Sequence, residues 1–214
     1  MRRHRAFYAA SQAVIRALLG VFCGLRYEGT EHVPLEGGCL LAANHKSYLD
    51  PPTLGSGLRR EIRYFAKREL FGMPILGFFV RAYGSIPVDR GAFDRRQLAT
   101  ALEVLQGGDA LLVFPEGTRI RHRGYGEAKV GVAMLAIKAG VPVIPVHLSG
   151  TWEPRRSLFR RIPIIVRYGP PLRFAREDGE ARRERYAEVT QTVMDAIRAL
   201  EPGRDRVEGL ATRS

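Results

Sequence analysis

Short apolar runs alternate along this chain with longer segments whose apolar residues recur at helical spacing. Uninterrupted apolar runs occur at residues 37–43 and 110–114, and a run that contains two prolines follows at 141–148. Runs of this length, bounded by glycine or proline, are typical of buried β-strands. The segment 93–106 instead places leucine and alanine on one helical face, and two glycines end it at 107–108.

Strands that alternate with helices predict an α/β fold, a layered domain with a mixed, mostly parallel central sheet flanked by helices. Further strands are expected at 25–29, 62–66, 85–88 and 162–168, and further helices at 51–58, 74–83, 128–139 and 180–200. The prolines of 141–148 predict a strand at a sheet edge or one with a bulge, because proline cannot donate a ladder hydrogen bond. Ligands of such folds collect beyond the carboxyl ends of the strands.

The N-terminal segment combines a basic opening with an apolar helix. Residues 6–25 contain a single charge, Arg16. The segment approaches the ~20 apolar residues of a spanning helix, but Arg16 interrupts it, which also disfavours a cleavable signal peptide. Apolar residues recur here at helical spacing: Phe7, Val14, Leu18 and Phe22. They predict an N-terminal amphipathic helix in a membrane interface, with a helix packed on the domain as the alternative.

The chain carries a formal net charge of +12. This excess favours an anionic partner, whether nucleic acid, an anionic membrane or a phosphorylated substrate. The basic residues are dispersed and accompany no known nucleic-acid-binding signature, so no nucleic-acid partner is expected. Cys23 and Cys39 lie in apolar stretches at no metal-ligand or redox spacing, so we expect buried free thiols and no metal site.

The block NHKSYLD, residues 44–50, follows the first apolar run. Its His45 and Asp50 are five residues apart, a spacing that would turn the side chains about 140° from each other on a regular helix. They meet only if a loop holds His45 and a helix begins near Asp50, which the following Pro51 and Pro52 favour. Asp50 could then orient one imidazole nitrogen while the other takes a proton from a hydroxyl. The alternative is a plain N-cap at Asp50.

Two further blocks place arginine at the ends of expected strands. FPEGTR, residues 114–119, is a glycine-containing turn after a buried run, and its backbone N–H groups with Arg119 suit a phosphate or a carboxylate. GSIPVDR, residues 84–90, would deliver Arg90 to the carboxyl end of a short strand. The alternatives are a structural Glu–Arg pair in the first block and a solvated ion pair with Asp89 in the second.

Taken together and in order, four blocks resemble those of a known family. NHKSYLD is similar to its His-x4-Asp block, GSIPVDR to the second, FPEGTR to the third and VPVIPV to the proline-bearing fourth. The chain thus resembles the bacterial 1-acylglycerol-3-phosphate acyltransferases, in the wider glycerolipid acyltransferase superfamily. The resemblance extends from about Gly29 through Pro171, and Ala128 departs from it where the family more often has an aromatic residue.

The resemblance implies a role for each matching residue. His45 would be the general base and Asp50 its orienting partner. Arg90 and Arg119 would bind the phosphate of the acceptor. Further substrate-binding positions implied in the same way are Glu116 and Gly117, which would shape the pocket, Thr118, which would support the turn, and Lys67 in the segment AKREL.

The implied function is transfer of a fatty acyl group from acyl-CoA or acyl-ACP to the free hydroxyl of 1-acylglycerol-3-phosphate. The product would be phosphatidic acid for phospholipid biosynthesis, formed without a metal or bound cofactor. The expected partners are lysophosphatidic acid or a related lysolipid, the acyl carrier and an anionic membrane surface. Another lysophospholipid or lipid alcohol as acceptor, and a non-catalytic basic membrane-surface protein, stay open as alternatives.

This interpretation divides the chain into three parts. We expect a membrane-surface helix at 1–26, an acyltransferase domain at 27–202 and a disordered tail at 203–214. The protein would lie on the cytoplasmic face of the cell membrane, as a peripheral or monotopic protein. The apolar run at 71–80 is expected to line an acyl channel, to dip into the membrane or to pack as a core helix.

Overall fold

The computed structural model describes residues 2–88, 95–122, 124–153, 157–158, 162–176 and 183–202. Its centre is a seven-stranded sheet with the order β1-β7-β6-β2-β5-β3-β4. The strands are β1 (Arg26–Glu28), β2 (Cys39–Ala43), β3 (Ile62–Lys67), β4 (Ile86–Val88), β5 (Ala110–Val113), β6 (Val143–Ser149) and β7 (Ile165–Tyr168). Neighbouring strands are parallel except for β6 and β7, which are antiparallel. The predicted mixed, mostly parallel sheet is confirmed.

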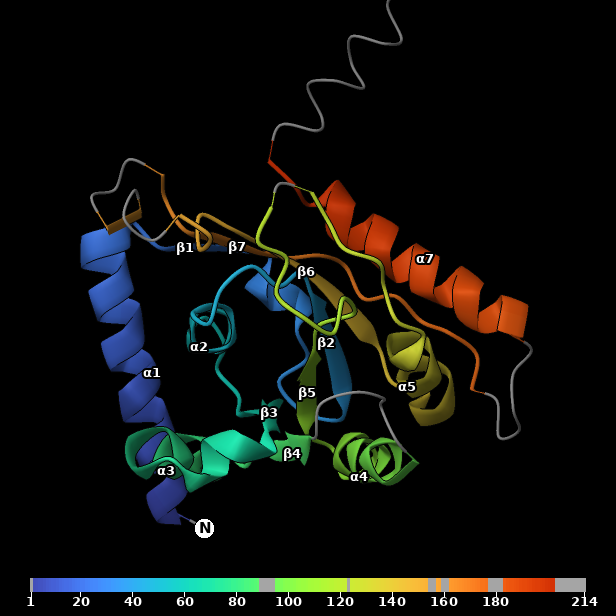
Figure 1. Cartoon of the computed structure of the whole chain (residues 1–214), viewed down its shortest axis with the longest axis horizontal. Helices are drawn as coiled ribbons and strands as arrows, with labels where there is room; N and C mark the ends of the chain where they lie inside the picture. The colour runs from blue at the N-terminus through green and yellow to red at the C-terminus, as the bar shows by residue number, and fades with distance from the viewer. Residues whose placement is uncertain are drawn as a thin grey trace, which may run out of the picture.

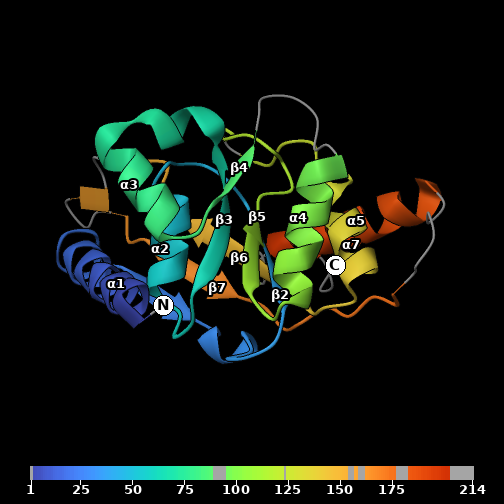
Figure 2. The same cartoon turned by 90° about the horizontal axis from the view of Figure 1, so that it is seen from below.

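Helices cover both faces of this sheet. They are α1 (Arg2–Cys23), α2 (Asp50–Ser56), α3 (Pro74–Ala82), α4 (Arg95–Gln106), α5 (Gly131–Ala139) and α7 (Arg183–Ala199), with short 3₁₀ turns η1 (Thr30–His32) and η2 (Arg68–Gly72). Figure 1 and Figure 2 show α1, α2 and α3 on one side of the sheet and α4, α5 and α7 on the other. The layered arrangement expected from the alternating sequence pattern is therefore present.

The central strand β2 explains why the sequence shows uninterrupted apolar runs. Leu40 and Ala42 pack in the cluster formed with α4, α5 and α7, whereas Leu41 and Ala43 pack in the cluster formed with α2. Successive side chains of a strand point to opposite faces, so a strand covered on both sides must be apolar throughout. The run 37–43 thus becomes the buried strand that leads directly to His45.

The expectation that the proline-bearing strand lies at an edge is wrong. Strand β6 lies inside the sheet, between β2 and β7. Pro145 has no N–H to donate to the sheet. Its carbonyl accepts from the N–H of Gly169, just past the end of β7, at 2.8 Å. A residue's N and C=O face the same neighbouring strand, so the missing donor of Pro145 faces the place where β7 has already ended.

Helix α1 turns its polar side toward the domain. The Tyr8 hydroxyl accepts from the Ile62 N–H at 3.0 Å, the Gln12 amide donates to the Gly55 carbonyl at 2.7 Å, and Ser11 shares a hydrogen bond with Tyr83. Large apolar side chains on the same helix are exposed instead: Val14, Leu18, Val21 and Phe22. The helix is therefore packed on the domain, the alternative weighed from the sequence, and its outer face is apolar.

Candidate active site

The catalytic candidates His45 and Asp50 meet at the carboxyl end of β2. His45 lies two residues beyond the strand and Asp50 is the first residue of α2. The imidazole Nδ1 lies 2.9 Å from Asp50 Oδ2, and the exposed fractions of the two side chains are 16% and 0%. The predicted arrangement of a loop followed by a helix start at Asp50 is confirmed, and it lets residues five apart face each other.

Asp50 also binds the backbone of the loop that precedes it. Its Oδ2 accepts from the backbone N–H of Lys46 at 2.6 Å and of Ser47 at 2.7 Å. An ionised carboxylate only accepts, so the hydrogen between Asp50 and His45 belongs to Nδ1 of the imidazole. That tautomer leaves Nε2 with a free lone pair, which is the arrangement required to take a proton from a hydroxyl.

The block that follows β5 holds His45 from a second side. The imidazole stacks on the Phe114 ring, with 3.9 Å between centroids and an interplanar angle of 13°. The His45 N–H donates to Glu116 Oε2 at 2.8 Å, and the Ile120 N–H donates to the His45 carbonyl at 2.8 Å. Both backbone polar groups of His45 are therefore bound by the 114–120 segment, which restricts where its ring can lie.

Glu116 binds the backbone of two loops of the site. The side chain is buried, and its second oxygen, Oε1, accepts from the Gly126 N–H at 2.8 Å. Each carboxylate oxygen thus binds the backbone of a different loop, one carrying His45 and the other carrying Gly126. Glu116 shapes the site by joining these loops, and its oxygens are directed to the backbone.

Arg119 lies beside the loop 44–49, which holds His45, leads to Asp50 and is called the catalytic loop below. Its guanidinium carbon is 3.4 Å from the centroid of the Tyr48 ring, which belongs to the same block as His45 and Asp50. Stacking through the guanidinium face leaves the N–H edges available for an oxyanion. Gly117 and Thr118, on the same turn, are exposed. The structure therefore brings a cation against the loop that joins His45 to Asp50, and an open turn precedes that cation in the chain.

Lys67 and Arg90 are farther from this pair or outside the described residues. Lys67 ends β3, is exposed, and pairs in register with Val88 at the end of β4. Strand β3 is separated from β2 by β5, which corresponds to about 10 Å between the two strands. Lys67 thus lies at the same carboxyl edge of the sheet as His45, two strands away. Arg90 lies outside the described residues.

Lys46 is a supporting residue that sequence reasoning missed. Its Nζ donates to the carbonyls of His122 and Gly124, and it faces the Tyr125 ring at 5.7 Å from the centroid. Burial lowers the pKa of Lys46. The only signal in the sequence was its place inside the His-x4-Asp block, because its partners lie in a loop more than seventy residues away.

His147 on β6 is a poor alternative for the general base. The side chain is buried, and burial lowers the pKa of His147 to about 4. Its Nδ1 has no hydrogen-bond partner in the part of the chain that the structure describes. Among described residues, no group of three or more His, Cys, Asp and Glu side chains is placed to hold a metal ion.

An apolar cavity of about 270 Å³ opens beside the catalytic loop. Its lining residues are Leu19, Cys23, Leu49, Gly150, Thr151, Ser157, Leu158 and Ile164. Leu49 directly precedes Asp50, and Leu19 and Cys23 belong to α1. The cavity thus lies between the residue that precedes Asp50 and the C-terminal half of α1.

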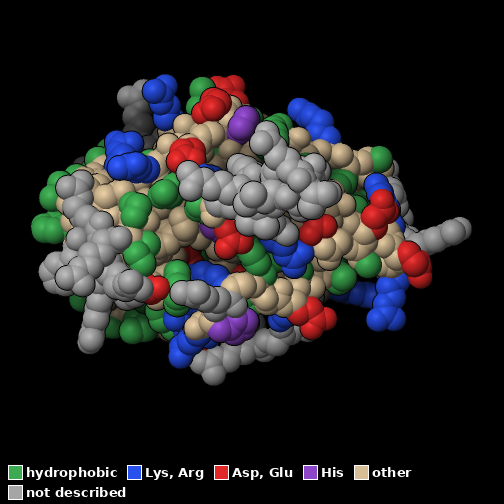
Figure 3. All heavy atoms as spheres, turned by 90° about the horizontal axis from the view of Figure 1, so that it is seen from above, with side chains coloured by type: hydrophobic (Ala, Val, Ile, Leu, Met, Phe, Trp, Pro, Cys, Tyr) green, Lys and Arg blue, Asp and Glu red, His purple; other side chains and the backbone are tan. Residues whose placement is uncertain are grey.

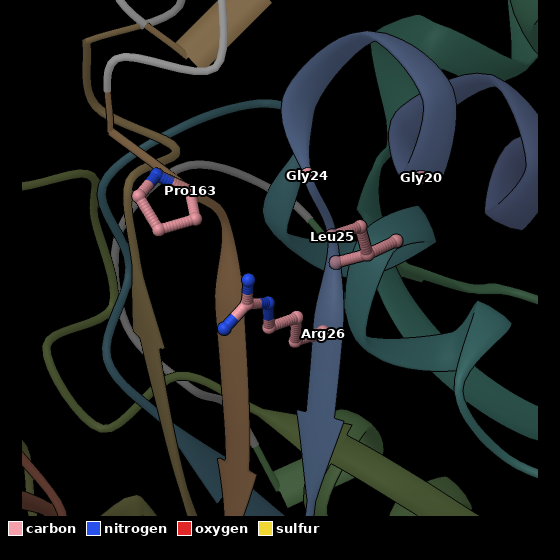
Figure 4. Close-up of a pocket in the computed structure, with 5 residues that line it drawn as sticks. All are labelled: Gly20, Gly24, Leu25, Arg26 and Pro163. Atoms are coloured by element: carbon pink, nitrogen blue, oxygen red, sulfur yellow. The ribbon is translucent and has the colours of Figure 1, made fainter.

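A second cavity, of about 390 Å³, lies at the C-terminal end of α1, and its lining contains no residue of the catalytic loop. Figure 4 shows its lining residues Gly20, Gly24, Leu25, Arg26 and Pro163, with the Arg26 side chain extending from β1 across β7. Cys23, close to both cavities, and Cys39 are buried free thiols, as the sequence predicted.

The fold and the paired His and Asp at the strand ends define an acyltransferase domain. Residues 24–149 match the family model described as Acyltransferase, and the chain belongs to that family of enzymes. It is 29% identical to the 1-acyl-sn-glycerol-3-phosphate acyltransferase of Bacillus subtilis (strain 168), over 94% of this chain and 98% of that protein. It is 32% identical to the Pseudomonas aeruginosa protein of the same name, over 89% of this chain and 76% of that protein.

A solved structure shows the same architecture. The crystal structure of the 1-acyl-sn-glycerophosphate (LPA) acyltransferase PlsC from Thermotoga maritima aligns with a TM-score of 0.72 and 26% identity. The alignment covers 100% of this chain and 83% of that chain. The resemblance noted from the four sequence blocks therefore extends to the whole arrangement of sheet and helices.

Proposed function

We propose that this acyltransferase moves a fatty acyl group from acyl-CoA or acyl-ACP to the free hydroxyl of 1-acylglycerol-3-phosphate, giving phosphatidic acid. The names of the relatives support this acceptor. The single observation that carries the proposal is the contact of Arg119 with Tyr48, a residue of the loop between His45 and Asp50. A phosphate bound there would hold a nearby hydroxyl within reach of the imidazole.

The chemical steps follow from these positions. Nε2 of His45 removes the proton of the acceptor hydroxyl as its oxygen attacks the thioester carbonyl carbon. Asp50, hydrogen-bonded at Nδ1, stabilises the imidazolium that forms. The tetrahedral intermediate then collapses, the C–S bond breaks, and the leaving thiolate takes the proton back from His45. Holding two substrates in one site contributes to the rate by orientation.

The apolar cavity beside Leu49 fits the acyl chain of one substrate. Its walls are almost entirely apolar, and two of its lining residues come from α1. Burial of hydrocarbon contributes about 0.8 kcal/mol per methylene group. An acyl chain in this cavity would therefore be bound between the membrane-surface helix and the loop that carries Asp50.

An acceptor comparison tests the phosphate role. We expect lysophosphatidic acid to be used far better than monoacylglycerol, which has the same hydroxyl chemistry but no phosphate. Arg119→Leu should raise the KM for lysophosphatidic acid by about tenfold to a hundredfold, because a charge-assisted hydrogen bond contributes roughly 1.5–3 kcal/mol. Arg121→Leu, at an exposed position two residues along, is the matched control. Equal KM values for Arg119→Leu and Arg121→Leu would count against the assignment.

We further propose that α1 and α3 dock together on an anionic membrane surface. The ring centroid of Phe7 lies 5.3 Å from that of Phe78 and 6.0 Å from that of Phe79, so the two helices join. The exposed apolar side chains of α3 are Ile75, Leu76, Phe78 and Phe79, which add to those of α1. The exposed Arg16 and Arg26 supply cations for anionic headgroups.

By length and composition, the segment Ala6–Cys23 also suffices to cross a membrane. Its hydrogen bonds to Gly55, Ile62 and Tyr83 support an in-plane position instead, because a spanning helix would have to give them up. A nucleic-acid surface has less support. Among the described residues on the face seen in Figure 3, Lys and Arg side chains are spread between other residues and form no continuous patch.

Charged substitutions on the proposed docking face test it. Val21 and Ile75 are 64% and 75% exposed, so aspartate there should leave the fold intact. The double variant Val21→Asp/Ile75→Asp should bind anionic liposomes at least tenfold more weakly, because each lost side chain removes about 1.5–3 kcal/mol of burial. Leu35→Asp, 65% exposed in the turn before β2, is the control. Unchanged sedimentation of the double variant with liposomes would exclude this docking face.

A further inference from the structure

Lys129 lies against the same turn as Arg119. A Cβ placed on Gly117 would come within 2.9–3.0 Å of Cε, Cδ and Nζ of Lys129, so the lysine side chain runs directly over this glycine. The Lys129 N–H also donates to the Pro115 carbonyl at 2.8 Å. Gly117 has a φ of 65°, a left-handed conformation that residues with a Cβ adopt at a cost. The missing Cβ at Gly117 therefore leaves room for the Lys129 side chain on this turn.

The charge of Lys129 is not neutralised within the described part of the chain. The side chain is exposed, and no ion pair there involves it. The nearest acidic residue of the turn, Glu116, has both oxygens bound to backbone N–H groups of His45 and Gly126. A cation whose hydrocarbon stem is fixed on a turn and whose ammonium is free is available for an anion from solution.

Lys129 and Arg119 flank the exposed residues of the turn. Arg119 is fixed on the Tyr48 ring and Lys129 on the surface of Gly117, and only Thr118 separates Gly117 from Arg119 in the chain. Lys129 also precedes α5, whose first turn contains no acidic residue. A positive side chain is electrostatically unfavourable at a helix N-terminus, and a bound anion would offset that cost. Arg119, Lys129 and the N-terminus of α5 thus all contribute positive charge near this turn.

We propose that Lys129 is a second cation of the active site and binds a phosphate group of a substrate across the turn from Arg119. The inference rests on the proposed function and deepens it. The phosphate has two possible sources with the same chemistry, the glycerol phosphate of the acceptor and the phosphates of the coenzyme A or phosphopantetheine donor. Lys129 binds and positions the substrate and takes no part in proton transfer.

Two substitutions separate the charge of Lys129 from its packing. Lys129→Met keeps a hydrocarbon stem over Gly117 and removes the ammonium, whereas Lys129→Arg keeps a cation. Lys129→Met should raise the KM for a phosphate-bearing substrate by roughly tenfold to a hundredfold with kcat little changed, and Lys129→Arg should restore most of the loss. Lys138→Met, in the last turn of α5, is the control for removing a lysine from the helix that follows Lys129.

The substrates used in the assay identify the source of the phosphate. A raised KM for lysophosphatidic acid, with the donor KM unchanged, assigns Lys129 to the acceptor. A raised KM for acyl-CoA that disappears with an acyl-pantetheine thioester, which lacks phosphate, assigns it to the donor. If both KM values of Lys129→Met lie within twofold of the wild-type values, the inference is overturned.

A binding measurement separates this inference from the proposed function. Glycerol 3-phosphate should bind the wild-type protein in isothermal titration calorimetry and bind Lys129→Met about tenfold or more weakly. That result together with an inactive wild-type protein would support Lys129 and reject the proposed reaction. Equal binding by both proteins would instead reject the role of Lys129 toward the acceptor, and an unchanged KM for acyl-CoA would then reject it toward the donor.

Discussion

Replacing His45 with alanine is expected to lower kcat for acyl transfer by about 10²–10⁴, the usual contribution of a positioned general base. The ring accepts the hydroxyl proton through Nε2, while Nδ1 is held by Asp50 at 2.9 Å. The KM values should change little, because the ring does not hold either phosphate. Steady-state rates of thiol release, measured with saturating lysophosphatidic acid and acyl-CoA, provide the test.

The structure predicts that this variant folds. The His45 backbone keeps its bonds to Glu116 and Ile120 whatever its side chain is, and the side chain is only partly buried. His122→Ala removes an exposed histidine on a neighbouring loop and serves as the control, with near wild-type kcat. If folded His45→Ala protein turned over at the wild-type rate, His45 could not be the base.

Replacing Glu116 with alanine should have the largest effect on stability. Each carboxylate oxygen accepts a backbone N–H at 2.8 Å, from His45 and from Gly126. Loss of two charge-assisted hydrogen bonds from a buried site costs about 3 kcal/mol or more. For a chain of 214 residues, that corresponds to a fall in Tm of roughly 6–12 °C. The value of kcat should fall as well, because the loop that positions His45 is released.

Two variants control for this interpretation. Glu116→Gln keeps one acceptor oxygen but turns an amide N–H₂ toward a backbone N–H, so its Tm should lie between those of wild type and Glu116→Ala. Glu127→Ala removes an exposed acidic residue on the same loop and should leave the Tm within 1–2 °C, the usual range for a surface substitution. A Glu116→Ala protein with wild-type Tm and kcat would show that the clamp between the loops is unimportant.

Much of the fold could be predicted because the signal was local. A strand buried on both faces has to be apolar throughout, and β2 and β5 are such strands. The position of β6 could not be predicted in the same way. Whether its Pro145 is tolerated depends on where β7 ends, and that end belongs to a strand far along the sequence. Local propensity carries no information about such a pairing.

The meeting of His45 and Asp50 could be predicted for a similar reason, whereas their roles came from the resemblance of the four blocks. His45 and Asp50 are separated by one short loop, and Pro51 and Pro52 favour a helix start at Asp50. The partners of Glu116 could not be predicted, because they are the backbone N–H groups of two other loops, which no residue pattern encodes. Lys129 was treated only as part of a helix, and its contact with Gly117 emerged from the packing of a turn against the segment before α5.

In the proposed reaction the acyl group passes to the hydroxyl of a phosphate-bearing lysolipid. Purified protein given acyl-CoA or acyl-ACP, with and without lysophosphatidic acid, tests it when thiol release and lipid products are measured together. The account predicts one phosphatidic acid formed for each thiol released, and release near background without the acceptor. Thiol release that is equally fast without lysophosphatidic acid, with free fatty acid as the product, would contradict it.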